Sequence, residues 1–106
     1  MTTPLITRLE EAAEGSRVLD TQIANHFDTP DTPHVTTSFD AAYAMAERVL
    51  PEMNCTGFDK TPLGVEAYVS LNDVDSGHWC EIGWHKSSPA LALCIAILKA
   101  NYKDKP

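Results

Sequence analysis

The residues best suited to chemistry lie between Glu66 and His85, where apolar and polar positions alternate as in β-strands. Glu66 and Glu81 would form an acid–base pair if neighbouring strands brought the two carboxyl groups together on one face. Carboxylates on a sheet are more often separately solvated, because acid–base catalysis requires surroundings that move one pKa away from the other. An enzyme using Glu66, Glu81 and His85 is therefore the least favoured functional class, and we expect no catalytic residue.

The histidines and cysteines do not predict a metal site. Strand alternation places His78 and Cys80 on one face and His85 on the other, and no CxxC or HxxxH spacing is present. Cys80 and Cys94 stand in apolar surroundings, where burial raises the pKa of a thiol and makes it unreactive. We expect neither a metal nor a cofactor.

The aromatic residues of the same stretch suggest a binding surface. Aromatic rings stack on bases or on another subunit, and arginines at the rim would supply cations. The alternative is that the rings pack beneath helices, which would explain aromatic residues on both faces of a sheet. The candidate ligand-binding residues are Tyr68, Trp79, Glu66, Glu81, His85, Arg8 and Arg17, with Arg48, Lys60 and Lys86 as further cations.

Periodicity predicts the elements that would position these residues. Helical patterns cover 3–14, 16–27, 39–50 and 89–101, the last three preceded by or beginning with a serine that can act as a cap. Alternation predicts strands over 52–60, 63–71 and 78–86, joined by short turns into an antiparallel meander. Residues 90–98 carry no polar side chain, so the helix that they form must be covered nearly all round.

Counting faces leads to an α+β fold, an α/β/α sandwich around an antiparallel sheet of three to four strands, in the order α-α-α-β-β-β-α. The second strand would bury Val65, Ala67, Val69 and Leu71, and the third would bury Cys80, Ile82 and Trp84 beside them. The opposite face would carry Glu66, Tyr68, Trp79, Glu81 and His85, under further helices or as a working surface. Residues 1–106 form a single domain, with a mobile loop at 28–37 and a tail at 102–106.

Composition restricts the classes of partner. Fifteen acidic against eight basic residues give a formal net charge of −7, which repels nucleic-acid backbones and anionic lipid surfaces. We therefore expect no polymeric nucleic acid and no membrane as partner, although a small anion can bind where a few cations converge. Residues 1–8 have no basic and apolar leader pattern, and three cysteines without CxxC spacing indicate free thiols, so we expect a cytoplasmic protein.

Three segments resemble the phage ABA sandwich domain, a family of small phage and prophage proteins. They are LITRLEEA at 5–12, TSFDAA at 37–42 and SPALALC at 88–94, where Ser88 takes the place of the usual threonine. The proline-rich segment 28–34 departs from the family pattern. The resemblance implies an α/β/α sandwich and a viral source, hence the host cytoplasm, but no catalytic or binding residues.

Three functional classes follow. The first is a non-catalytic, phage-encoded accessory or host-interaction protein, in its most specific form a counter-defence protein that sequesters a small nucleotide-like signal between subunits of a homo-oligomer. The second is a structural or assembly accessory that acts by protein–protein contact. The third is a small enzyme. We rank them in this order.

Overall fold

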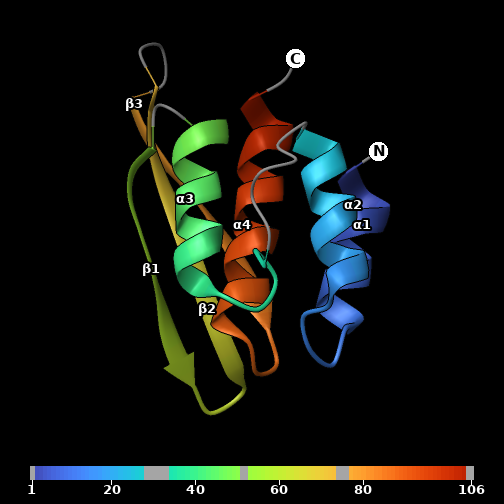
Figure 1. Ribbon diagram of the computed structural model, residues 1–106. Coiled ribbons are helices and arrows are strands. Elements are labelled where there is room, and N and C mark those ends of the chain that lie inside the picture. Colours follow the sequence, from blue (N-terminus) through green and yellow to red (C-terminus); the bar gives the residue numbers. More distant parts are fainter. Residues whose placement is uncertain (1, 28–33, 51–52, 74–76, 105–106) are drawn as a thin grey trace.

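The computed structural model describes residues 2–27, 34–50, 53–73 and 77–104, with side chains described at 5–27, 34–50, 53, 56–70 and 80–100. Its elements, drawn in Figure 1, are α1 (Thr2–Glu11), α2 (Arg17–Phe27), α3 (Phe39–Val49), β1 (Met53–Thr61), β2 (Gly64–Asp73), β3 (Gly77–His85) and α4 (Pro89–Asp104). The strands form one antiparallel sheet in the order β1-β2-β3. The α+β fold and its element order are thus confirmed.

Three helices begin after a serine whose hydroxyl accepts a hydrogen bond from the first helical turn. Ser16 Oγ accepts from Leu19 N at 3.2 Å and Ser88 Oγ accepts from Leu91 N at 3.2 Å. Ser38 caps α3 in the same way. Each hydroxyl pairs an N–H group that a helix leaves without a partner, so the sequence locates these helix starts correctly.

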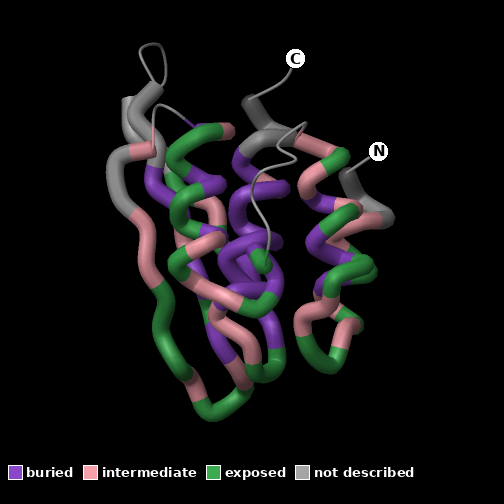
Figure 2. The backbone as a smooth tube through the Cα atoms, viewed as in Figure 1, coloured by how far each residue is buried: buried purple, intermediate pink, exposed green. Residues whose placement is uncertain are grey.

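Helix α4 is the centre of the molecule. Every residue from Leu91 to Leu98 has 0% exposed surface, and the tube of α4 is accordingly buried in Figure 2. The helix packs against β2 and β3 on one side and is flanked by α1 and α3. The expectation that this apolar helix is covered nearly all round is confirmed, and the helix continues to Asp104, into the expected tail.

The helices gather on one side of the sheet, so the layers differ from the expected α/β/α sandwich. In Figure 1 the sheet lies on one side, α3 and α4 come next, and α1 and α2 lie beyond them. No helix of the described residues lies over the other face of the sheet, and the Ile82 and Trp84 side chains there are 53% and 38% exposed. Because α4 alone has apolar surface all round, it is α4 rather than the sheet that is enclosed between two layers.

Strand register decides which side chains face the helices. Val65 pairs with His85, Ala67 with Gly83 and Val69 with Glu81, and residues directly opposite one another share a face. These are the side chains on the helix side of the sheet.

The expected face assignment of β3 is therefore wrong. Cys80, Ile82 and Trp84 were expected in the core, yet all three are exposed and lie on the uncovered side, opposite Ser70, Tyr68 and Glu66 respectively. His85, expected on the working surface, is instead fully buried. The expectation placed β3 one residue out of register with β2. Such a shift moves every side chain of β3 to the opposite face of the sheet.

The expected mobile loop at 28–37 is described only from residue 34. Residues 34–37 form a turn in which Val35 and Thr36 are buried. Asp20 Oδ1 accepts hydrogen bonds from Thr36 N at 2.8 Å and from Thr36 Oγ1 at 2.6 Å. This pairing of a buried carboxyl with backbone and hydroxyl donors attaches the turn to α2. Residues 28–33 lie outside the described part.

Among the described residues, none of the helices has the length and apolar content needed to cross a lipid bilayer.

Candidate functional site

The uncovered side of the sheet is the best candidate for a functional surface. Two rows of side chains cross all three strands there, because residues paired between strands share a face. One row contains Asp59, Glu66 and Trp84, and the next contains Gly57, Tyr68 and Ile82. These six residues are called the open face below.

Two glycines leave room for the aromatic rings of the open face to lie against the sheet. A Cβ atom on Gly57 would lie 2.7 Å from Tyr68 Oη, and one on Gly64 would lie 2.9 Å from Trp84 Cε2. Each ring therefore occupies space that a side chain would otherwise fill, and covers bare backbone. A ring that packs on the sheet loses less freedom when a partner binds than a ring surrounded by solvent, which favours binding.

The charges of the open face are negative. Asp59 and Glu66 are both exposed and directly opposite each other on β1 and β2. Like charges in this position repel. Lys60, the next residue of β1, pairs with Val65 and so lies on the helix side of the sheet.

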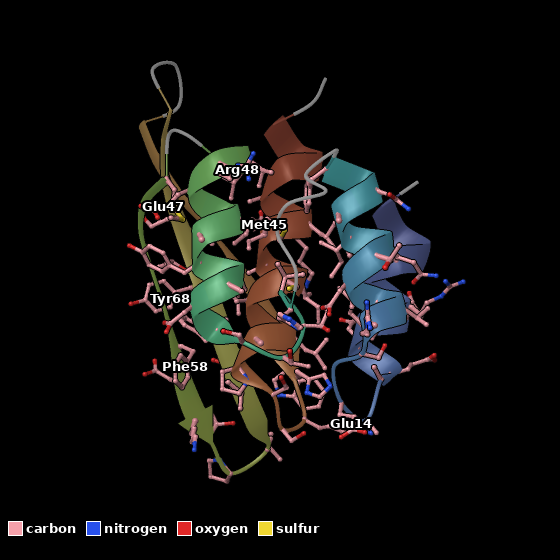
Figure 3. All side chains as sticks on the ribbon, in the orientation of Figure 1. Glu14, Met45, Glu47, Arg48, Phe58 and Tyr68 are labelled. Carbon is pink, nitrogen blue, oxygen red and sulfur yellow. The ribbon has the colours of Figure 1, made fainter. Side chains whose placement is uncertain are left out.

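The structure brings together only part of the expected ligand-binding set. Glu66 and Tyr68 share the open face, and Figure 3 shows Tyr68 at the sheet, on the opposite side of the molecule from the loop with Glu14. Glu81 lies opposite Val69 on the helix side. The backbone of Trp79 belongs to β3, but its side chain lies outside the described residues.

Arg8 and Arg17 do not line the rim of the sheet. Both are exposed, but they belong to α1 and to the start of α2, the layer that Figure 1 places beyond α4. They cannot act together with Tyr68 on one ligand within a single copy of the chain.

His85 is a structural residue with both ring nitrogens engaged. Its Nδ1 atom accepts from Ser87 N at 3.0 Å and from Ser88 N at 2.9 Å. Nε2 lies 2.6 Å from the Ala12 carbonyl oxygen. Since two N–H groups point at Nδ1, the ring proton belongs on Nε2, where it is donated to that carbonyl. The imidazole joins the end of α1 to the start of α4 and has no atom left for a ligand.

The hypothesis of a paired acid and base is contradicted by the register. Glu66 lies opposite Trp84 on the open face, whereas Glu81 lies opposite Val69 on the helix side. The sheet itself separates the two carboxyl groups, so they cannot act on one substrate. Within the described residues, no group of three or more His, Cys, Asp or Glu side chains could hold a metal ion.

Cys94 is buried in α4, and its thiol donates to the Val35 carbonyl oxygen at 3.3 Å. Burial, and to a smaller extent the negative charge of Asp20, raises the pKa of this thiol far above its ordinary value. The folded protein thus keeps the thiol protonated and unreactive, which agrees with the sequence-based expectation for this residue.

This thiol gives the protein a defined alkaline instability. Above the ordinary thiol pKa of about 8.5 the unfolded chain loses a proton that the folded chain keeps, so the free energy of unfolding falls as the pH rises. We expect this thiol to lower the free energy of unfolding by about 1.4 kcal/mol per pH unit. Urea unfolding between pH 8 and 10 measures this slope. Cys94→Ala should flatten the dependence, whereas Cys80→Ala, at an exposed thiol, should leave it unchanged. Equal slopes in wild type and Cys94→Ala would contradict this.

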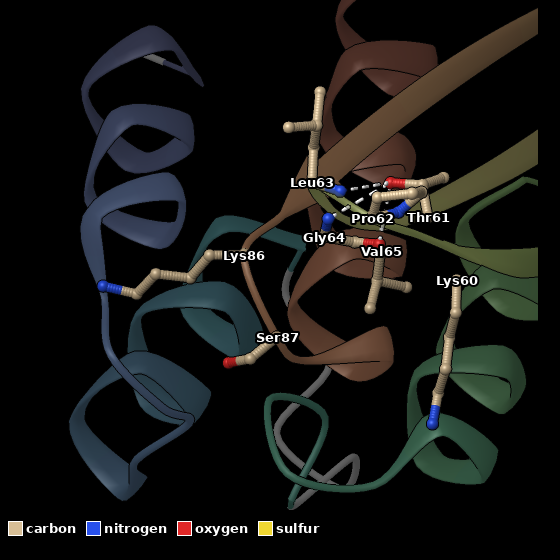
Figure 4. A pocket seen from close by; sticks show the side chains of 8 residues that line it. All are labelled: Lys60, Thr61, Pro62, Leu63, Gly64, Val65, Lys86 and Ser87. Atoms are coloured by element: carbon tan, nitrogen blue, oxygen red, sulfur yellow. Dashed lines mark hydrogen bonds between the residues drawn. The ribbon is translucent and has the colours of Figure 1, made fainter.

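A shallow pocket of about 280 Å³ lies at the end of the sheet, lined by Lys60, Thr61, Pro62, Leu63, Gly64, Val65, Lys86 and Ser87. Figure 4 shows its two lysines on opposite sides, with side chains that extend in different directions. Thr61 Oγ1 is used within the hairpin, where it accepts from Leu63 N and Gly64 N. The pocket lacks the converging cations that a small anion would need.

Sequence reasoning missed three residues of the site: Asp59, Ile82 and Trp84. Asp59 falls in the strand with the weakest alternation, and the other two were assigned to the core. Gly83 between them was the available signal, since a glycine inside a strand often marks the close approach of another backbone.

No protein-family model, curated protein or solved structure matches this chain. The resemblance to the phage ABA sandwich domain therefore stays a prediction.

Proposed function

We propose that this protein is a non-catalytic accessory protein that binds another protein through the open face. The observation that carries the proposal is the exposure of Ile82 and Trp84, 53% and 38%, on adjoining rows of a sheet face that none of the described helices covers. Apolar and aromatic side chains grouped on a rigid surface are typical of protein-binding sites, where tryptophan and tyrosine contribute much of the affinity.

Sequestration of a nucleotide-like signal, the function ranked first from the sequence, receives less support. Tyr68 and Trp84 could stack on the base of a nucleotide. Glu66 is directly opposite Trp84, and Asp59 is directly opposite Glu66, so the two carboxylates would repel the phosphates of the nucleotide. Arg8 and Arg17 lie in the other helical layer, and the Lys60 and Lys86 side chains do not converge. Protein–protein contact, ranked second, is the better supported function.

Affinity capture with matched baits tests the proposal. We compare wild type, Ile82→Ser, the double variant Tyr68→Ala/Trp84→Ala, and Val18→Ala, which alters a side chain that is 66% exposed on α2. We expect a protein that wild type and Val18→Ala retain and that both open-face baits lose. Ile82→Ser keeps the test valid if the double variant does not fold, because this exposed side chain contributes little to the core.

Two results would overturn the proposal. One is the same set of proteins on all folded baits. The other is a nucleotide-sized mass bound to purified wild type in native mass spectrometry and absent from the open-face variants, which would restore the small-ligand function.

A further inference from the structure

We infer that the partner binds the open face through an arginine, whose guanidinium stacks on Trp84 and pairs with Glu66. This inference rests on the proposed function and specifies the chemistry of the partner. The occupant is a basic segment of a different protein rather than a second copy of this chain.

The geometry of one row supports an arginine. Glu66 is directly opposite Asp59 on one side and Trp84 on the other, so neighbouring Cβ atoms in the row are about 5 Å apart. A guanidinium is planar, donates two parallel hydrogen bonds to a carboxylate and stacks on an aromatic ring. One arginine side chain can therefore contact Glu66 and Trp84 together, with Asp59 in reach.

Charge complementarity favours the same partner. The opposed Asp59 and Glu66 carboxylates repel each other, and within the described residues neither forms a hydrogen bond or an ion pair. The whole chain carries a net charge of −7. A cation bound between the two carboxylates relieves this repulsion, and the acidity of the molecule attracts basic segments from a distance.

The other occupants fit less well. A second copy packed face to face would bring another Asp59 and Glu66 pair into the same dehydrated contact. Addition of a strand at the edge of β3 is disfavoured, because the Lys99 ammonium donates to the Ile82 carbonyl at 3.2 Å. A lysine at an edge strand discourages strand pairing.

The test uses hexa-arginine and hexa-lysine peptides with a fluorescent label, titrated with the full chain at low salt and followed by anisotropy. We expect hexa-arginine to bind more tightly than hexa-lysine, because only the guanidinium stacks on Trp84 while it pairs with Glu66. Asp59→Asn/Glu66→Gln should weaken hexa-arginine binding at least tenfold. Trp84→Leu should remove the preference for arginine over lysine.

The matched control removes two negative charges elsewhere. Glu11 and Glu14 are both exposed, and Figure 3 shows Glu14 on the opposite side of the molecule from Tyr68. Glu11→Gln/Glu14→Gln should weaken binding less than twofold. Equal weakening by the two double variants would show an attraction to net charge alone and would overturn the inference.

A second readout separates recognition from stability. If Asp59 and Glu66 repel each other in the isolated protein, Asp59→Asn should raise its Tm while lowering its affinity for hexa-arginine. A lowered Tm would show that the pair serves the fold, which would also overturn the inference. If hexa-arginine fails to bind but the open-face baits still lose their protein, the inference fails and the proposed function stands.

Discussion

Gly83→Ala is expected to destabilise the protein by about 3 kcal/mol or more. A Cβ atom at Gly83 would clash with the Ala92 carbonyl oxygen and lie 2.5 Å from Ala96 N. Both atoms belong to the backbone of α4, which cannot move aside as a side chain can. The strand and the helix would have to separate along their main contact. Urea unfolding followed by circular dichroism measures the loss.

Gly57→Ala is the matched control on the other face of the same sheet. Its new Cβ would lie 2.7 Å from Tyr68 Oη and 3.0 Å from Cζ of the same ring. These atoms form the outer end of a side chain rather than backbone, so they can shift away. We expect a change below about 1 kcal/mol, because the clash is relieved and alanine is less flexible than glycine in the unfolded chain. Equal losses in the two variants would contradict the close packing of β3 against α4.

His85→Ala is expected to cost about 3 kcal/mol or more, although the residue takes no part in binding. The fully buried ring pairs with three backbone groups, Ser87 N, Ser88 N and the Ala12 carbonyl oxygen. Alanine leaves a cavity and removes the partner of three backbone polar groups near the junction of α1, β3 and α4. The free energy of unfolding from urea titration measures this effect.

His85→Asn separates the polar contribution from the loss of volume. The asparagine oxygen can take the position of Nδ1 and accept from Ser87 N and Ser88 N, so this variant should recover at least about 1 kcal/mol relative to alanine. If the two variants are equally stable, the hydrogen bonds to Nδ1 contribute nothing and His85 acts by packing alone.

The sequence predicts the core of this fold well because the apolar segment that forms α4 is compatible with only one structure. The unbroken apolar segment 90–98 follows a helix start at Ser88 and Pro89, so it can only be an enclosed helix. Leu91 to Leu98 are indeed without exposed surface. The capping serines carry similar local information. Element order and the antiparallel meander follow from the same patterns.

The sequence does not predict which face of β3 is covered, because that depends on register rather than on composition. Ile82 and Trp84 alternate like core residues, but the pairing of Asp73 with Gly77 places them opposite Tyr68 and Glu66. A turn with one residue more or less would have reversed the faces. The contact of Gly83 with α4 then fixes the observed register by allowing the helix to approach.

The register of β3 also decides which of the predicted site residues lie together. Glu66 and Tyr68 were identified because their own strand alternates strictly, and they lie on the open face. Simple alternation along β3 groups Glu81 and His85 with them and excludes Trp84, because it implies a register one residue away from the observed one. Long-range pairing therefore determines the site more than the residue types do.

Site-specific photo-cross-linking tests the central claim, that a different protein binds to the open face, most directly. A benzoylphenylalanine is placed at position 82 in one protein and at position 18 in another, two exposed positions on β3 and α2, and each is irradiated in an extract of the cells that carry the gene. We expect a protein cross-linked from position 82 only, and lost when Trp84→Ala is added. The same products from both positions, or only a dimer of the chain itself from position 82, would contradict it.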